Sequence, residues 1–131
     1  MVETQSSLVR DQWWTLSFPS EIYPDQPGIY EWRIGDQGLY IGKSKRLRKR
    51  IREYPNNVRK LIYGLPYRKG KPTAYREVHH ELRLAHDQFL TVTVTVLENC
   101  EHSQLDVREQ HWIAVRKAQA ELGGPRVFNA T

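Results

Sequence analysis

The sequence predicts an α/β (α+β) domain in which a small three-stranded antiparallel sheet is flanked by helices. Two runs of β-forming residues, 28–34 and 39–43, are separated by a Gly-Asp-Gln-Gly turn and predict a hairpin. A third run, residues 89–97, alternates apolar side chains with threonines, as a half-buried strand does. Helical patterns lie between and after these strands, and 131 residues suit one domain.

The first 26 residues are expected to form an N-terminal extension (1–26) ahead of the domain proper, which spans residues 27–131. A short helix is predicted over residues 7–16, and Pro19, Pro24 and Pro27 then indicate a loop. We expect this extension to pack on the domain or to form an oligomer contact, so a homo-oligomer stays open.

The hairpin carries a tyrosine on each strand, Tyr30 and Tyr40. If its loop centres on Asp36 with an odd number of residues, Tyr30 pairs with Gly42 and the two phenols share a face. A two-residue turn would place them on opposite faces. Gly42 is expected to let a ligand approach the backbone closely.

A helix is predicted directly after the hairpin, over residues 45–54. Its apolar residues Leu47, Ile51 and Tyr54 recur at helical spacing and form a stripe to be buried. Pro55 is expected to end this helix.

The rest of the chain predicts further helices around the third strand. Residues 57–64 suit a second short helix, and residues 67–73 form a basic loop rich in glycine and proline. Residues 74–87 are polar but compatible with a helix. A last long helix is expected to begin at Ser103 or Asp106 and to end before Gly123.

Positive charge is concentrated in one part of the chain. Residues 43–72 contain twelve Lys and Arg against one acidic residue, a net charge of +11, whereas the remainder carries −6 and the whole chain +5. A chain whose positive charge is concentrated in one part has an asymmetric electrostatic field that attracts polyanions, and nucleic acid is the commonest such partner. An anionic lipid surface is the weaker alternative, because the basic stretch lacks a broad apolar face.

The composition excludes several classes of protein. A single cysteine, Cys100, rules out an internal disulfide and a multi-cysteine zinc site. No apolar run approaches the length of a membrane span, and the N-terminus lacks the pattern of a secretory signal. We therefore expect a cytoplasmic, reducing environment and no membrane partner.

Two tripeptides and five further positions form an ordered pattern. Residues 28–30 read Gly-Ile-Tyr and residues 40–42 read Tyr-Ile-Gly, with the hairpin turn between them. A lysine follows at once, an arginine and a tyrosine lie one helical turn apart on the next helix, and a glutamate and an asparagine come near the C-terminus. These are Lys43, Arg50, Tyr54, Glu109 and Asn129. Over residues 27–131 the chain resembles a stand-alone, single-domain member of the GIY-YIG nuclease superfamily.

This resemblance implies a divalent-metal-dependent DNA endonuclease that hydrolyses phosphodiester bonds. Its catalytic residues would be Tyr30, Tyr40, Lys43, Arg50, Tyr54 and Glu109. Glu109 would hold Mg²⁺ or Mn²⁺, and Arg50 offers a fork that matches phosphate oxygens. One signature tyrosine would be the general base; Tyr40 is favoured because it is nearest to Lys43, whose charge would lower a phenol's pKa.

DNA is the expected partner, and several side chains are expected to contact it: Lys43, Arg46, Arg50, Arg68, Lys69, Lys71 and Asn129. For Asn129 a local hydrogen bond is the alternative to a phosphate contact. The enzyme would be of phage, mobile-element or restriction type. Three other functions stay open: a non-catalytic nucleic-acid-binding module on the same fold, a repair nuclease that acts on branched DNA with a partner, and a module that binds an acidic protein.

Overall fold

The sheet has four strands rather than the predicted three, and one pair is parallel. The computed structural model describes residues 8–129; residues 1–7 and 130–131, which belong to the predicted extension and nuclease domain, lie outside the described residues. The strands lie in the order β1-β4-β2-β3. The central strand β2 is antiparallel to both β3 and β4, while β1 runs parallel to β4. Their bounds are β1 Thr15–Ser17, β2 Gly28–Ile34, β3 Gly38–Ser44 and β4 Val92–Asn99.

The predicted helix over residues 7–16 is wrong, because none of residues 8–16 is helical and the last two open β1. Contacts with a distant helix decide this conformation. The ring of Trp13, which is buried, packs edge-on against His86 with 5.3 Å between centroids. The Nε2 atom of His86 accepts the Arg10 N–H at 2.9 Å. Tertiary contacts of this kind override a short local pattern.

The hairpin has the register that places both phenols on one face. Tyr30 pairs with Gly42, and Trp32 pairs with Tyr40. The loop between Ile34 and Gly38 therefore has three residues, and its first residue, Gly35, has φ of +47°. Because side chains alternate along a strand, Tyr30 and Tyr40 lie on the same face of the sheet.

The first helix, α1 (Leu47–Ile62), continues through Pro55, so the prediction that Pro55 ends it is wrong. Pro55 has no N–H to offer the Ile51 carbonyl, which costs the helix one hydrogen bond. The buried stripe nevertheless extends beyond it to Val58. The sequence predicts two helices here, over residues 45–54 and 57–64. Burial of the continuous apolar stripe joins them into the single helix α1.

The other elements differ from the prediction mainly at their ends. The strand β4 begins three residues later than predicted, because Phe89 has φ of +59°, a left-handed conformation that a strand does not continue. Its alternation is confirmed: Val92, Val94 and Val96 are buried. The remaining helices are α2 (Glu77–Asp87), a short 3₁₀ turn η1 (His102–Gln104) and α3 (Leu105–Glu121).

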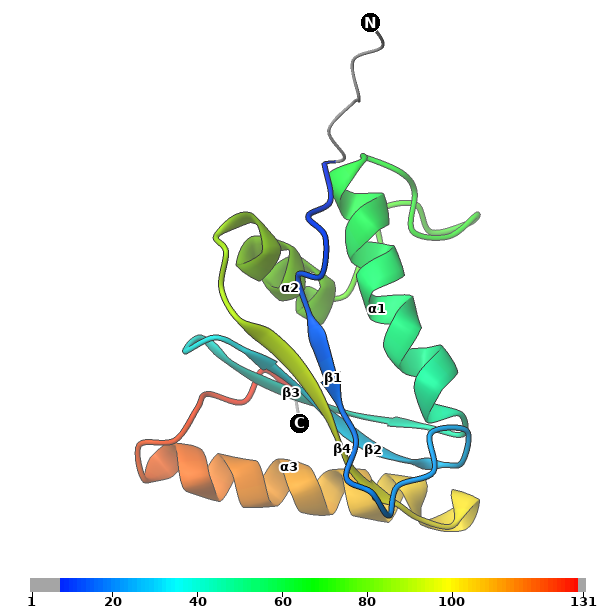
Figure 1. The fold of residues 1–131 in the computed structure, drawn as a ribbon, viewed down its shortest axis with the longest axis vertical. Coiled ribbons are helices and arrows are strands. Elements are labelled where there is room, and N and C mark those ends of the chain that lie inside the picture. The colour runs from blue at the N-terminus through cyan, green and yellow to red at the C-terminus, as the bar shows by residue number, and fades with distance from the viewer. Residues whose placement is uncertain (1–7, 130–131) are drawn as a thin grey trace, which may run out of the picture.

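Helices cover both faces of the sheet, so the domain has three layers (Figure 1). One core lies between the sheet and the pair α1 and α2, and contains Tyr30, Trp32 and Ile51. A second, smaller core lies between the sheet and α3, and contains Ile41 and Ile113. The edge of β3 at Tyr40 to Gly42 is therefore close to helices from both layers.

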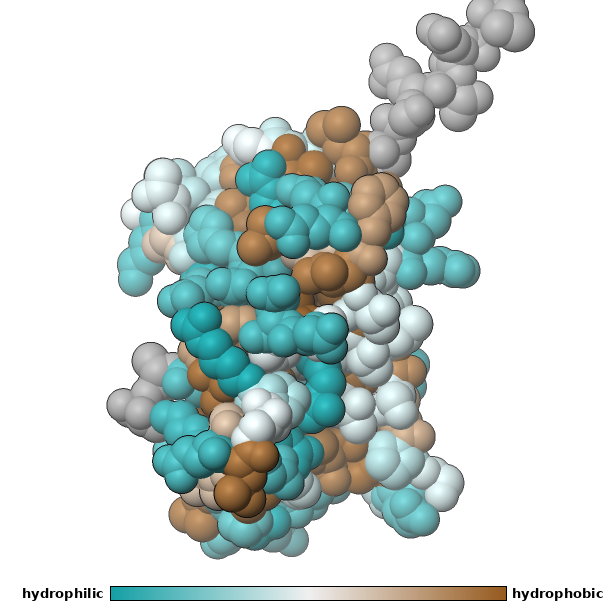
Figure 2. All heavy atoms as spheres, turned by 90° about the vertical axis from the view of Figure 1, so that its left-hand side faces the viewer, coloured by the Kyte–Doolittle hydropathy of each residue, from teal (hydrophilic) through white to brown (hydrophobic). Residues whose placement is uncertain are grey.

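Within residues 8–129 no helix is both long and apolar enough to cross a membrane. The side of the molecule drawn in Figure 2 is largely hydrophilic across its middle, with separate apolar areas above and below. The surface of that side thus offers no single apolar face.

Candidate active site

A cavity of about 390 Å³ is lined by side chains from both helical layers and from the hairpin. The structure brings all six predicted catalytic residues to this cavity: Tyr30, Tyr40, Lys43, Arg50, Tyr54 and Glu109. Asn129 and Arg76 also line it. Residues that are up to 99 positions apart in the chain thus share one concave site, which is where binding sites are usually found.

Tyr30 and Tyr54 form the buried floor of the site. Their side chains are 1% and 2% exposed, and their hydroxyl oxygens are 2.5 Å apart. Burial, reinforced by Tyr54, raises the pKa of Tyr30 well above its ordinary value. A Cβ atom on Gly42 would lie 2.3 Å from the Tyr30 hydroxyl, so Gly42 makes room for this phenol. The close approach at Gly42 is thus made by the Tyr30 side chain, and the approach of a ligand to the Gly42 backbone stays a prediction.

The cation at Tyr40 is Arg76, not Lys43 as predicted. An Nη2 N–H of Arg76 donates to the Tyr40 hydroxyl, and the guanidinium carbon lies 5.3 Å from the centre of the Tyr40 ring. Burial, and next the neighbouring Tyr54, raises the pKa of Tyr40 to about 12, and Arg76 opposes that rise. Tyr40 is consequently a protonated phenol at pH 7.

Lys43 is directed to the carboxylates of α3. Its Nζ is 3.6 Å from Glu109 Oε1 and forms an ion pair with Asp106 as well. The Glu109 side chain is 16% exposed. Burial raises the pKa of its carboxyl, and Lys43 opposes the rise. Asp106 was not among the predicted residues, although its position three residues before Glu109 puts both on one face of α3.

Arg50 reaches the cavity from α1, one helical turn before Tyr54. Its guanidinium carbon lies 5.6 Å from the centre of the Tyr54 ring, and its Nη1 donates to Glu53 at 2.7 Å. The Arg50 side chain is 35% exposed. Arg50 therefore offers the cavity a cation whose position is set by an ion pair and a ring.

Arg76 and His79, like Asp106, are residues that sequence reasoning missed. Arg76 is the N-cap of α2, and its backbone N–H donates to Nδ1 of His79 at 3.1 Å. Burial, and next the charge of Arg76, lowers the pKa of His79 to about 4. His79 is therefore a neutral acceptor that holds the start of α2. A histidine three residues after a helix start was the one available signal.

Asn129 makes a local pair of hydrogen bonds, the alternative that the sequence left open. Its Oδ1 accepts the Ile41 N–H at 2.8 Å, and its Nδ2 donates to the Ile41 carbonyl at 2.8 Å. The side chain thus extends the edge of β3 as a strand would. Contact with DNA remains a prediction for this residue.

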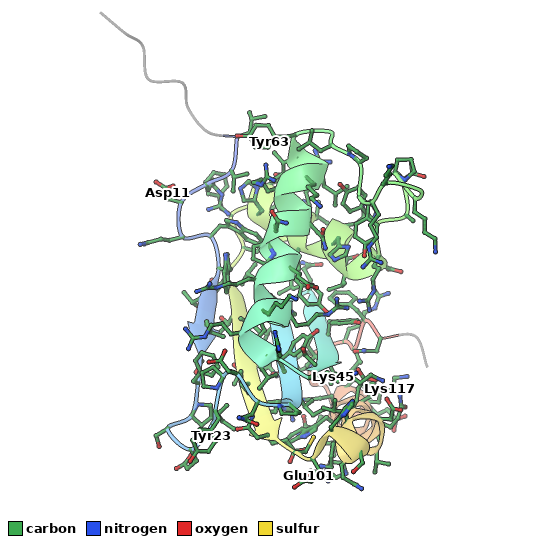
Figure 3. The ribbon with its side chains drawn as sticks, turned by 90° about the vertical axis from the view of Figure 1, so that its right-hand side faces the viewer. Asp11, Tyr23, Lys45, Tyr63, Glu101 and Lys117 are labelled. Atoms are coloured by element: carbon green, nitrogen blue, oxygen red, sulfur yellow. The ribbon has the colours of Figure 1, made fainter. Side chains whose placement is uncertain are left out.

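The other predicted DNA contacts lie on the exposed surface outside the cavity. Arg46 precedes α1, and Arg68, Lys69 and Lys71 lie on the loop between α1 and α2. Seen from the side of α1 (Figure 3), this loop is near Tyr63, at the opposite end of the helix from Lys45. The guanidinium of Arg68 lies 4.9 Å from the centre of the Tyr67 ring.

The site offers a metal ion few protein ligands. Among residues 8–129 no three His, Cys, Asp or Glu side chains are arranged to hold a metal ion. Glu109 is the carboxylate that lines the cavity, and a carboxylate oxygen is a ligand that Mg²⁺ accepts. Mg²⁺ commonly keeps most of its waters and binds one or two carboxylates, so this residue set is compatible with it.

Comparison with known proteins finds similarity over a short part of the chain. Over 31 residues, 24% of this chain, it is 48% identical to UvrABC system protein C of Thermus thermophilus. Over 32 residues it is 53% identical to UvrABC system protein C of Gemmatimonas aurantiaca. The matched stretch spans 5% of the length of each of these relatives. No protein-family profile matches the chain, and no solved structure matches it.

Proposed function

We propose that this chain is a divalent-metal-dependent DNA endonuclease, which hydrolyses phosphodiester bonds in the cavity between β3, α1 and α3. The observation that carries the proposal is the convergence of six residues in one site: Tyr30, Tyr40, Lys43, Arg50, Tyr54 and Glu109. The short match to UvrABC system protein C, which contains a GIY-YIG domain, supports the same nuclease class. The field of the basic segment, at +11, supports a polyanionic substrate.

The cations of the site would bind the scissile phosphate. Arg50 and Arg76 line the same cavity, and each guanidinium presents paired N–H donors that suit phosphate oxygens. Lys43, beside Glu109, would add a third positive charge as a point contact. Such preorganised charge stabilises the negative charge that builds up on the phosphate in the transition state.

The phenols would position the attacking water. Tyr30 lines the cavity but is almost fully buried, and its hydroxyl is hydrogen-bonded to that of Tyr54. The Tyr40 hydroxyl lines the cavity and would hold the water as a hydrogen-bond partner. A pKa of about 12 leaves Tyr40 protonated at pH 7. It could act as a general base only if positive charge beyond Arg76 lowered this pKa, so that the phenol first released its own proton to solvent and the phenolate then took one from the water.

Glu109 would hold the metal, Mg²⁺ or Mn²⁺. A bound divalent ion supplies positive charge at the phosphate and lowers the pKa of its own water. The ion pairs of Lys43 with Asp106 and Glu109 keep the Glu109 carboxylate oriented toward the cavity.

A repair nuclease that acts on branched DNA with a partner is the second candidate. Both matched relatives are named as components of a UvrABC system, which favours a role beside other proteins over an isolated restriction activity. The two candidates share the site and differ in the DNA that is cut.

Cleavage assays on plasmid, hairpin and branched DNA test the proposal. Purified protein with Mg²⁺ or Mn²⁺ should nick at least one substrate, EDTA should stop the reaction, and Arg50→Ala should abolish it. Preference for branched DNA would select the repair candidate. DNA binding that ignores EDTA, with no cleavage of any substrate, would instead assign the non-catalytic binding module.

A further inference from the structure

A second cavity, of about 430 Å³, lies beside the start of α2. Its walls are mostly carbon: Leu61 and Leu65 come from the end of α1 and the turn after it, and Pro66 and Pro72 from the basic loop. The ring of Tyr75 and the exposed His80 complete it. A volume of this size is within the range of cavities that bind small ligands.

The Tyr75 ring is held in a fixed position at this cavity. Its hydroxyl donates to the Leu65 carbonyl at 2.6 Å. The Tyr67 ring lies 5.0 Å away, and the His80 ring stands edge-on at 6.3 Å. An aromatic side chain that is fixed in advance loses little entropy when a flat ligand stacks on it.

A chain of ring contacts connects the second cavity with the candidate active site. His79 contacts Tyr75 on one side, at 6.1 Å between centroids, and Tyr54 on the other, at 5.7 Å. Tyr75 is also the chain neighbour of Arg76, which lines the active-site cavity. Adjacent residues thus line the cavity proposed to bind phosphate and an apolar one.

Positive charge is concentrated on the loop beside the second cavity. Arg68, Lys69 and Lys71 are exposed on the loop that forms one wall, and no acidic side chain is among the described residues that line it. Rings interleaved with exposed Lys and Arg are the pattern with which proteins bind single-stranded nucleic acid, through stacking and backbone charge.

We propose that Tyr75, Arg76 and His80 form a subsite for one unpaired nucleotide next to the scissile phosphate, with its base in the apolar cavity and its phosphate on Arg76. The occupant is a nucleobase, because a flat ring carried on an anionic backbone matches both the apolar walls and the positive rim. A paired base has both faces covered within the duplex, so the substrate must carry an unpaired nucleotide there. The assignment of the unpaired nucleotide to DNA rests on the proposed function.

Binding in EDTA to a labelled duplex with a single-stranded overhang, compared with a blunt duplex, tests the subsite. Tyr75→Leu keeps bulk but removes the ring, and should weaken overhang binding about 5- to 150-fold, the range that one stacked base contributes. Tyr75→Phe keeps the ring and loses only the hydrogen bond to Leu65 that fixes it, so it should bind the overhang more tightly than Tyr75→Leu does. Tyr23→Leu is the matched control, because Tyr23 is exposed and lies outside the basic segment.

Equal affinity of wild type and Tyr75→Leu for the overhang would overturn the proposal. So would an equal loss for the overhang and the blunt duplex. A change of oligomeric state in Tyr75→Leu or His80→Leu, with DNA binding intact, would also overturn it and assign the cavity to contact between copies.

Photocrosslinking tests the subsite in the wild-type protein, so its result does not depend on whether a variant folds. An overhang that carries 5-iodouracil as its unpaired base should crosslink to Tyr75 or His80, and crosslinks confined to other residues would contradict the subsite. Both measurements are made without metal and do not depend on catalysis. Crosslinking here, together with no cleavage in the separate assay with Mg²⁺ or Mn²⁺, would keep the subsite and remove the nuclease. Cleavage in the assay with metal by a protein that forms neither crosslink would keep the nuclease proposal and overturn the subsite.

Discussion

The candidate active-site cavity and the basic loop (residues 67–73) differ in how their side chains are held. Those of the cavity are buried or paired, whereas the cationic side chains of the loop are exposed. In the cavity, Tyr30 and Tyr54 are almost fully buried and bonded to each other, and Lys43 is paired with two carboxylates. On the loop, by contrast, Arg68, Lys69 and Lys71 are exposed and, among the described residues, form no ion pair. The side chains of the cavity are held in a fixed geometry, as the proposed catalysis would require, whereas the loop contributes exposed positive charge.

The largest effect is expected where the cavity holds its one predicted metal ligand. Glu109→Gln keeps the shape of the side chain but removes its charge, so Mg²⁺-dependent cleavage should fall by about 1,000-fold or more. Plasmid nicking measures the loss, and DNA binding in EDTA should persist. The control is Glu121→Gln, an exposed carboxylate at the end of the same helix. Cleavage at the wild-type rate by Glu109→Gln would end the assignment of Glu109.

A glycine from each region compares their rigidity directly. A Cβ at Gly42 would lie 2.3 Å from the hydroxyl of Tyr30, whereas one at Gly70 on the loop would meet nothing within 4 Å. Gly42→Ala should lower the free energy of unfolding by about 1–3 kcal/mol, because the buried ring must move. Gly70→Ala should change it by less than about 1 kcal/mol. Chemical denaturation measures both, and equal values would show that the Tyr30 phenol is not held in place.

His79 lies between the two regions and predicts a pH dependence of stability. Its pKa is about 4 in the folded chain, mainly through burial, and near 6.5 when unfolded. The unfolded state therefore binds the extra proton between these values, so this contribution is complete above pH 6.5 and is lost as the pH falls toward 4. The loss should be on the order of 2–3 kcal/mol.

Unfolding by denaturant at several pH values, compared between wild type and His79→Gln, isolates this contribution from that of the carboxylates. The slope between pH 6.5 and 4 should flatten in His79→Gln and persist in His111→Gln, whose histidine is exposed on α3. A slope unchanged by His79→Gln would mean that His79 titrates normally.

Local patterns predict much of the cavity because its residues occupy regular positions. Strand alternation and a three-residue loop are enough to put Tyr30 and Tyr40 on one face, and one helical turn separates Arg50 from Tyr54. The spacing between Tyr40 and Glu109 carries no such rule, because α3 and β3 are far apart in the sequence and are brought together only by tertiary packing. That part of the site could be predicted from the family resemblance alone.

The failures are those in which distant contacts decide local structure. No neighbouring residue in the sequence indicates that Arg76 will reach Tyr40. The strand β1 has three residues, which are too few to form a recognisable strand pattern. Pro55 lies inside α1 because the buried stripe continues through Val58. At Pro55 packing outweighs a local preference of about 3 kcal/mol.

The smallest effect on the fold, and the one that best separates the two regions, is expected from the loop. Replacement of Arg68, Lys69 and Lys71 by alanine should leave the free energy of unfolding within about 0.5 kcal/mol, since all three side chains are exposed. DNA affinity should fall, and its log–log dependence on salt should become shallower by about 2 to 3, because each phosphate contact contributes close to one.

A second triple variant removes the same charge elsewhere, at Arg33, Arg83 and Arg126 outside the basic segment. If the loop contacts phosphates directly, only the loop variant changes the salt slope, because contacts and not overall charge release counterions. If both variants change it equally, the loop acts through the long-range field of the molecule. The contrast between the two regions would then be one of proposed phosphate contact in the cavity against electrostatic steering by the loop.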